Sequence, residues 1–168
     1  MNVSVEEQRD GERFVVFAVA DMRLAVALEQ VVRVTRAVEI QPLPGAPAVV
    51  AGVVVLRGER IAAIDMRRRL GLAPRELELS DRLVLVRRGA WRWFLIADAV
   101  IGVVELPCSS MRERSPQAPP PAQRGADDCR GAEFHLEEGV VSQLELAHLL
   151  TSVESHEVRR LLAEWAAE

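Results

Sequence analysis

The chain has 168 residues, a net charge of −4 and 49% hydrophobic residues, which is enough apolar material for one packed domain or two small subdomains. All 21 cationic residues are arginines and tyrosine is absent, which excludes a Schiff-base lysine, a phosphate-loop lysine and a phenolic acid or base. The mild acidity argues against nucleic acid as the main partner.

Targeting signals are not visible in the sequence. The longest apolar run, Ala46 to Leu56, has about half of the ~20 residues that a membrane helix needs. The start MNVSVEEQRD lacks the basic and apolar regions of a signal peptide. Cys108 and Cys129 do not form a disulfide framework. We therefore expect a cytoplasmic protein without direct membrane insertion.

Short apolar segments separated by turns follow the polar residues 1–12, which we expect to form a flexible N-terminus. The pattern predicts strands at Phe14–Ala20, Leu24–Leu28, Val49–Leu56, Arg60–Asp65, Leu83–Val86, Trp91–Ala97, Val100–Leu106, Phe134–Leu136 and Val140–Leu144. Strands this short at this spacing are typical of small all-β barrels. The predicted strands do not alternate with helices, so the sequence does not indicate a parallel α/β fold.

Helices are predicted at few places. Met66–Leu70 and Glu145–Leu150 suit short helices, and Thr151 with Glu154 forms a capping box at the start of a C-terminal helix over 151–168. One face of that helix carries an apolar stripe made of Val158, Leu161, Leu162 and Trp165. We expect the stripe to pack on the host domain; a partner-binding helix is the alternative.

Residues 107–131 contain five of the nine prolines, three of them consecutive at 119–121. Few residues in this segment could anchor a core, and strand-like sequence resumes after it. The segment is therefore predicted to be a flexible loop inserted in a domain that covers residues 13–150, and not a boundary between two domains.

Catalytic and metal-binding patterns are not found. His135, His148 and His156 lack metal-ligand spacing, and the serine-hydrolase and dinucleotide glycine motifs are missing, so we predict no catalytic residues, no metal and no cofactor. Asp65 and Asp98 each follow a strand-like run, and we expect each to cap a following helix and not to act as a base. The Arg67–Arg69 run is expected to be a solvated face or an acidic-partner contact.

Residues Phe14 to Leu106 resemble the chemotaxis coupling-protein (CheW-like) domain. The resemblance rests on the order and spacing of several motifs: Pro47, Gly52, Leu56-Arg57-Gly58, Ile64-Asp65-Met66-Arg67, Gly71 and Asp98. It implies an all-β fold of two five-stranded SH3-like β-barrels side by side, with a helix at the C-terminal end. It also implies a non-enzymatic scaffold that couples the cytoplasmic tip of chemoreceptors to the regulatory domain of a histidine kinase, in the cytoplasm or recruited to receptor arrays.

The resemblance also implies binding residues. Leu56, Arg57 and Gly58 match the motif associated with receptor signalling, where the arginine either reaches a receptor carboxylate or holds its own turn. Val31 and Arg33 match the kinase-facing edge, with plain core packing as the alternative for Val31.

Several positions depart from the family pattern. Arg33 stands where an acidic residue is usual, Val55 replaces an asparagine, Ala63 a proline and Phe94 a small residue. A reversed charge at Arg33 weakens the usual kinase contact or suits a partner of opposite charge. Trp91, Trp93 and Phe94 lie on one predicted strand and cannot all face inward, because successive side chains alternate between faces. They are candidates for an added apolar contact, with a repacked core as the alternative.

Three hypotheses for function follow. The first is a scaffold that bridges receptor and kinase. The second is a divergent CheW-like adaptor that keeps one of these interfaces. The third is a small-molecule sensor domain with a ligand near Trp91 and Trp93; an enzyme has the least support.

Overall fold

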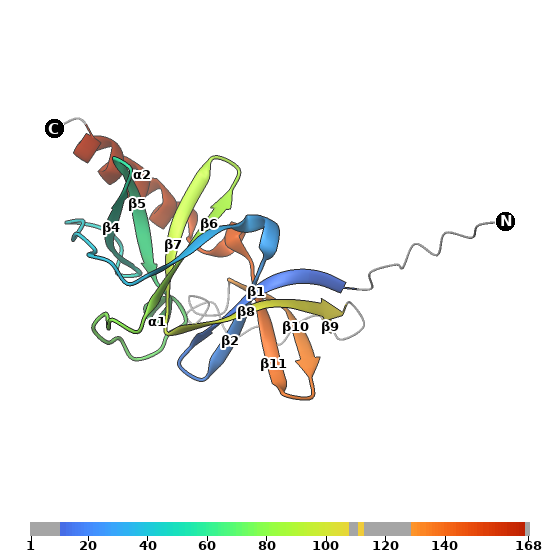
Figure 1. Cartoon of the computed structure of the whole chain (residues 1–168). Coiled ribbons are helices and arrows are strands. Elements are labelled where there is room, and N and C mark those ends of the chain that lie inside the picture. The colour runs from blue at the N-terminus through green and yellow to red at the C-terminus, as the bar shows by residue number, and fades with distance from the viewer. Residues whose placement is uncertain (1–10, 108–110, 113–128, 167–168) are drawn as a thin grey trace.

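The computed structural model describes residues 11–107, 111–112 and 129–166, and its two sheets lie side by side (Figure 1). The strands are β1 (Gly11–Val19), β2 (Met22–Ala27), β3 (Val31–Arg36), β4 (Val50–Leu56), β5 (Glu59–Asp65), β6 (Arg82–Arg88), β7 (Trp91–Ala97), β8 (Ala99–Pro107), β9 (Met111–Arg112), β10 (Arg130–Leu136) and β11 (Gly139–Leu144). The helices are α1 (Met66–Arg69), α2 (Ser152–Ala166) and the single 3₁₀ turns η1 (Leu28–Gln30) and η4 (Leu146–His148).

The first sheet has six strands in the order β8-β1-β2-β11-β10-β9, and the second has five in the order β3-β6-β7-β5-β4. The mainly β architecture is therefore as predicted, but the count of five strands in each half is wrong for the first sheet. Neither sheet forms a closed barrel among the described residues. In the second sheet, the edge strands β3 and β4 are not paired with each other, but the chain after β3 forms one antiparallel bridge with β4, Gln41 to Val53.

The buried apolar side chains form three clusters, one of which joins the two sheets. The largest combines residues of both sheets with α2, and includes Phe17, Leu24, Ile64, Leu95 and Val158. A second lies within the six-stranded sheet, where Phe14 and Phe134 meet edge to face with ring centres 5.2 Å apart. The third lies within the five-stranded sheet and is built from Val54, Ile61, Ala63, Leu83, Leu85 and Phe94.

Helix starts follow the sequence signals. The Asp65 carboxylate accepts hydrogen bonds from the N–H groups of Arg67 and Arg68 and so caps α1, as predicted. Thr151 and Glu154 form the expected capping box, with N–H to side-chain distances of 2.8 and 3.1 Å. The predicted helix at Glu145–Leu150 is only the 3₁₀ turn η4.

The apolar stripe of α2 packs on the host domain, as expected. Val158 is buried in the largest cluster, and Leu162 is packed against it. Two arginine–aromatic contacts add to this interface: Arg159 lies 3.6 Å from the ring centre of Trp91, and Arg60 lies 4.8 Å from that of Trp165. In Figure 1, α2 runs beside β4 and β5.

Two regions differ from the prediction. Strand β3 was not predicted, because its arginines and half-exposed valines suit an edge that no second layer covers. The ends of the Pro-rich segment 107–131 belong to the fold: Pro107 ends β8, Met111–Arg112 form β9, and Cys129 is fully buried. Likewise β1 begins at Gly11, inside the predicted N-terminal tail; residues 1–10, 108–110, 113–128 and 167–168 lie outside the described residues.

Candidate partner-binding site

Side chains of β3 and β4, the two edge strands of the five-stranded sheet, line two hollows, and we call this region the seam. One hollow of about 370 Å³ at its end is lined by Val32, Arg33, Leu56, Arg57, Glu59, Leu85 and Arg92. An adjoining hollow of about 280 Å³ is lined by Thr35, Val38, Glu39, Gln41, Val54, Val55, Leu56 and Phe94. Leu56 lines both hollows, and the buried side chains of Val54, Leu85 and Phe94 form an apolar floor beneath them.

The arginine of the Leu-Arg-Gly motif sits on the hairpin turn between β4 and β5. Leu56 pairs with Glu59, so Arg57 and Gly58 form a two-residue loop, with φ values of 50° and 82°. Both values lie in the left-handed region, as a type I′ hairpin turn requires. Glycine adopts that region freely, whereas an arginine there costs about 1 kcal/mol or more. The motif therefore holds an exposed arginine in a backbone conformation that does not favour it.

Arg57 does not stabilise its own turn through its side chain. Among the described residues it makes no hydrogen bond or ion pair, and the same is true of Arg33. Both residues are exposed. The third arginine of this hollow, Arg92, is paired with Glu59. Two cationic groups in the hollow therefore remain available to a partner.

An irregularity in β3 brings Arg33 to the seam. The pairing with β6 shifts between Val31 and Arg33, so that Val32 is an extra residue in β3. Such a bulge re-aims side chains, and here both Val32 and Arg33 line the hollow. Val31 is instead half-buried and packs against the largest core cluster. The structure thus brings Arg33 together with Leu56 and Arg57 and leaves Val31 apart from them.

The aromatic residues of β7 divide between two faces, as strand alternation requires. Trp93 is buried with α2 against it, and Trp91 lies beneath Arg159. Phe94 faces the other way and forms part of the seam floor. The hollow beside the two tryptophans is only about 30 Å³, far below the ~300 Å³ of usual ligand pockets, because α2 fills the space.

The close approach of the segment after β3 to β4 explains why position 52 is a glycine. Gly52 has a φ of 156°, and a Cβ atom there would lie 2.2 Å from the carbonyl oxygen of Gln41. The single bridge between Gln41 and Val53 needs this close approach. Beyond the bridge, the seam stays open at Val55, which is 48% exposed. The usual asparagine at that position is thus replaced by an aliphatic side chain that faces the seam.

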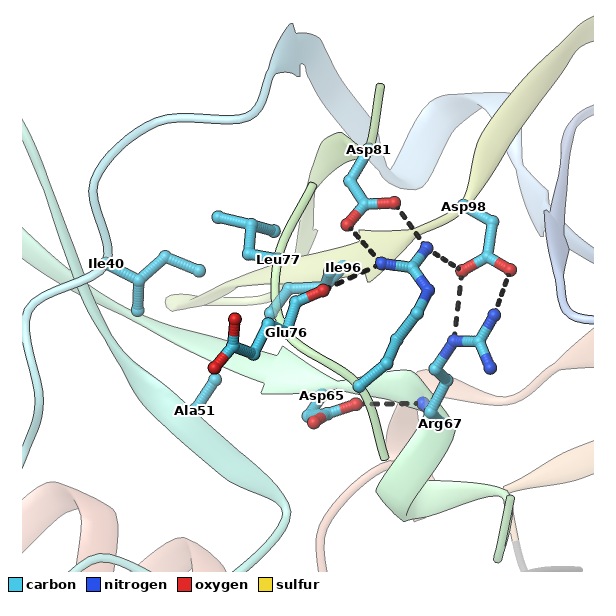
Figure 2. A pocket seen from close by; sticks show the side chains of 10 residues that line it. Ile40, Ala51, Asp65, Arg67, Glu76, Leu77, Asp81, Ile96 and Asp98 are labelled. Atoms are coloured by element: carbon cyan, nitrogen blue, oxygen red, sulfur yellow. Dashed lines mark hydrogen bonds and ion pairs between the residues drawn. The ribbon is translucent and has the colours of Figure 1, made fainter. Parts of the chain in front are cut away.

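A second cluster of charges lies at the junction of the two sheets (Figure 2). Arg75 donates to both carboxylate oxygens of the buried Asp81, at 2.8 and 2.6 Å, and to Asp98 at 3.0 Å. Arg67 donates to Asp98 at 2.6 Å. A hollow of about 250 Å³ adjoins this network and is lined by Ile40, Ala51, Asp65, Arg67, Arg75, Glu76, Leu77, Asp81, Ile96 and Asp98.

Asp98 does not cap a helix, so that prediction was wrong. It lies between β7 and β8, where the chain passes from one sheet to the other, and no helix follows. Its carboxylate accepts the Ala20 N–H at 2.8 Å as well as the two arginines. Because Ala20 belongs to the turn between β1 and β2, Asp98 ties the two sheets together.

Asp81 and Arg75 were missed in the sequence, since only the fold brings them together with Asp98. Burial alone would raise the pKa of Asp81, but the hydrogen bonds from Arg75 and from the Glu78 N–H, with the nearby positive charges, hold that pKa below its ordinary value. The hydrogen bond with Asp81 likewise raises the pKa of Arg75. These groups are saturated by each other, which indicates a structural role.

No group of three or more His, Cys, Asp or Glu side chains in the described part of the chain could hold a metal ion. Burial raises the pKa of the Cys129 thiol, although Arg69 acts against this shift, so the thiol is a poor nucleophile near neutral pH. None of the described helices is long and apolar enough to cross a membrane.

Comparison with known proteins places this fold. The chain is 31% identical over 105 residues to Protein FrzA of Myxococcus xanthus, covering 62% of this chain and 66% of FrzA. It is 30% identical over 80 residues to the chemotaxis protein CheW of Bacillus subtilis (strain 168), covering 48% and 51%. The match thus spans about two thirds or less of these relatives.

A solved structure agrees with the fold. The scaffolding protein TtCheW from Thermoanaerobacter tengcongensis superimposes with a TM-score of 0.73 over 86% of this chain and 95% of that one, at 24% sequence identity. The family model of the CheW-like domain matches residues 13–154, which include nearly all of both sheets and the start of α2. The chain therefore belongs to the CheW-like domain family.

Proposed function

We propose that this protein is a non-enzymatic coupling protein, which links the cytoplasmic tip of a chemoreceptor to the regulatory domain of a histidine kinase. Membership of the CheW-like family supports this proposal, and the relatives named above include a chemotaxis protein and a scaffolding protein. The single observation that carries it is the seam, an open apolar surface with arginines that have no partner of their own among the described residues.

The chemistry of the seam suits reversible protein binding. Val32 and Val55 are about half exposed and flank an apolar floor, while Arg33 and Arg57 stand at the rim. Protein interfaces commonly combine an apolar centre with a charged rim, and arginine is favoured there because its stem packs while its head binds carboxylates. Trp91 and Trp93 are engaged with α2, and Phe94 lies beneath the seam but is only 1% exposed, so none of the three aromatic candidates offers an exposed contact at this surface.

A binding experiment tests the proposal. Purified full-length protein is titrated with the receptor signalling-tip fragment and with the kinase regulatory domain of its host, each alone and both together, by calorimetry and size-exclusion chromatography. A coupling protein binds both fragments and forms a ternary complex. We expect Arg57→Ala to weaken at least one of these contacts about tenfold, since a carboxylate loses its partner. An Arg88→Ala variant, on the exposed hairpin end of β6, serves as the control.

If only one fragment binds, the protein is an adaptor with one interface and not a scaffold that bridges two partners. The arginine at position 33 is the observation that favours this second hypothesis. Binding of neither fragment would overturn the coupling function. The cytoplasmic location and recruitment to receptor arrays are part of the same proposal, and co-localisation of a fluorescent fusion with receptor clusters tests them.

A further inference from the structure

The seam brings together two residues that family resemblance assigns to different partners. Arg57 matches the receptor motif and Arg33 the kinase-facing edge, yet both line one hollow of about 370 Å³. That volume is the size of a few side chains and not of two protein segments. We propose that Arg33 and Arg57 act on a single partner, and that this partner inserts one extended, acidic, aliphatic segment between β3 and β4. This inference rests on the proposed function and states the chemistry of the segment that the seam binds.

The charge of the segment follows from the charges in the hollow. Arg33, Arg57 and Arg92 outnumber the only carboxylate, that of Glu59, and Glu59 is already paired with Arg92. Neither Arg33 nor Arg57 has a hydrogen-bonding or ionic partner among the described residues. Carboxylates are the complement of such a pair of guanidinium groups.

The aliphatic character of the segment follows from the floor. Leu85 lies under the arginine end, and Val54 and Phe94 lie under the adjoining hollow. Val32 and Val55 stand half exposed at the two walls. Leu85, Val54 and Phe94 are themselves no more than 4% exposed, so the apolar surface that a segment with small aliphatic side chains removes from water is that of Val32 and Val55.

The extended conformation of the segment is inferred from β3 and β4, the two strands that form the walls of the seam. Both β3 and β4 are edge strands of the five-stranded sheet and are not paired with each other; the segment after β3 bridges β4 at Gln41 and Val53. Edge strands offer unpaired backbone groups that an added strand can bind. From Arg33 to Arg36 the wall is about 10 Å long, at ~3.3 Å per residue. Glu39 lines the far end of the seam, so the acidic residues of the segment belong at the Arg33 end.

A defined peptide tests this site directly. The probe is the blocked hexapeptide Glu-Val-Glu-Val-Thr-Val, and its matched control carries lysine in place of both glutamates. Binding to the full-length protein is followed by NMR through the Nε–H signals of Arg33 and Arg57 and the backbone amides of β3 and β4. We expect both arginine signals to shift with one dissociation constant, the edge amides to gain protection from hydrogen exchange, and the lysine peptide to bind at least tenfold more weakly.

Variants of Arg33 and Arg57 then test whether the two arginines form one binding site or two. Arg33→Glu and Arg57→Glu should each weaken the glutamate peptide about tenfold, and the double variant should lose less than the product of the two. Arg88→Glu, an exposed arginine outside the seam, should leave binding unchanged. The same variants are applied to the receptor and kinase fragments, where both single changes should weaken the same fragment.

The outcomes distinguish this inference from the coupling function. If the peptide shifts only one arginine or neither, or if each arginine affects a different fragment, the single acidic segment is wrong even though coupling stands. If the peptide engages both arginines but neither fragment binds, the chemistry of the seam stands and the coupling function is wrong.

Discussion

Two groups of arginines in this protein have opposite environments. At the junction of the sheets, Arg67 and Arg75 are bound by the carboxylates of Asp81 and Asp98. At the seam, Arg33 and Arg57 are exposed and have no such partner among the described residues. Saturated arginines hold the fold together, while unsaturated ones remain available to another protein. In a chain without lysine, the type of cation alone does not reveal which role an arginine has.

The junction should show the largest effect on stability. Asp81→Asn leaves Arg75 partly buried beside a neutral amide, and Asp81 itself is only 1% exposed. We expect the free energy of unfolding to fall by about 3 kcal/mol, as is usual when one partner of a buried ion pair is removed. Urea denaturation measures it. The seam control Arg33→Gln should change stability by less than about 0.5 kcal/mol; equal effects would erase the distinction between the two groups.

Low pH should destabilise the unaltered protein in the same way as Asp81→Asn does. The folded pKa of Asp81 lies below its ordinary value, so its ionised form stabilises the fold at all pH values above the unfolded pKa of about 4. This contribution is lost as the pH falls through the folded pKa. The Tm of the unaltered protein should therefore approach that of Asp81→Asn below about pH 4. A difference in Tm that persists at lower pH would show that Asp81 acts by shape and not by charge.

The hairpin turn at the seam should show a smaller effect on stability than the junction, with the opposite sign. Arg57 has a φ of 50° at a type I′ turn, where asparagine before glycine is strongly preferred. Arg57→Asn should therefore raise the free energy of unfolding by about 0.5–1 kcal/mol while it weakens partner binding. Urea denaturation and calorimetry on one preparation measure both. Destabilisation by this variant would mean that Arg57 holds its own turn, as the alternative interpretation states.

The sequence predicted what depends on neighbouring residues. The capping box of Thr151 and Glu154 and the cap at Asp65 were found because their partners lie two or three residues away. The apolar stripe of α2 was recognisable from its helical spacing, and its contact with the host domain followed. Asp98 was misassigned, because a strand-end aspartate before a helix and one that meets distant arginines have the same local sequence.

The family pattern identified Arg57 and Arg33 as candidates, but it separated them by presumed partner. Only the fold of the five-stranded sheet and the bulge at Val32 place both in one hollow. Strand β3 escaped prediction for a related reason: an edge strand keeps charged and exposed residues, so its pattern lacks the apolar run of the central strands.

By itself, the sequence determined the mainly β class, most strand positions, the caps of α1 and α2 and the family, because these depend on local periodicity and on short motifs at fixed spacing. The tertiary structure decided which charges meet. It paired Arg75 with Asp81 and left Arg57 and Arg33 together at an open seam. Electrostatic interactions depend on distance in space and on burial, and neither is written in the order of residues along the chain.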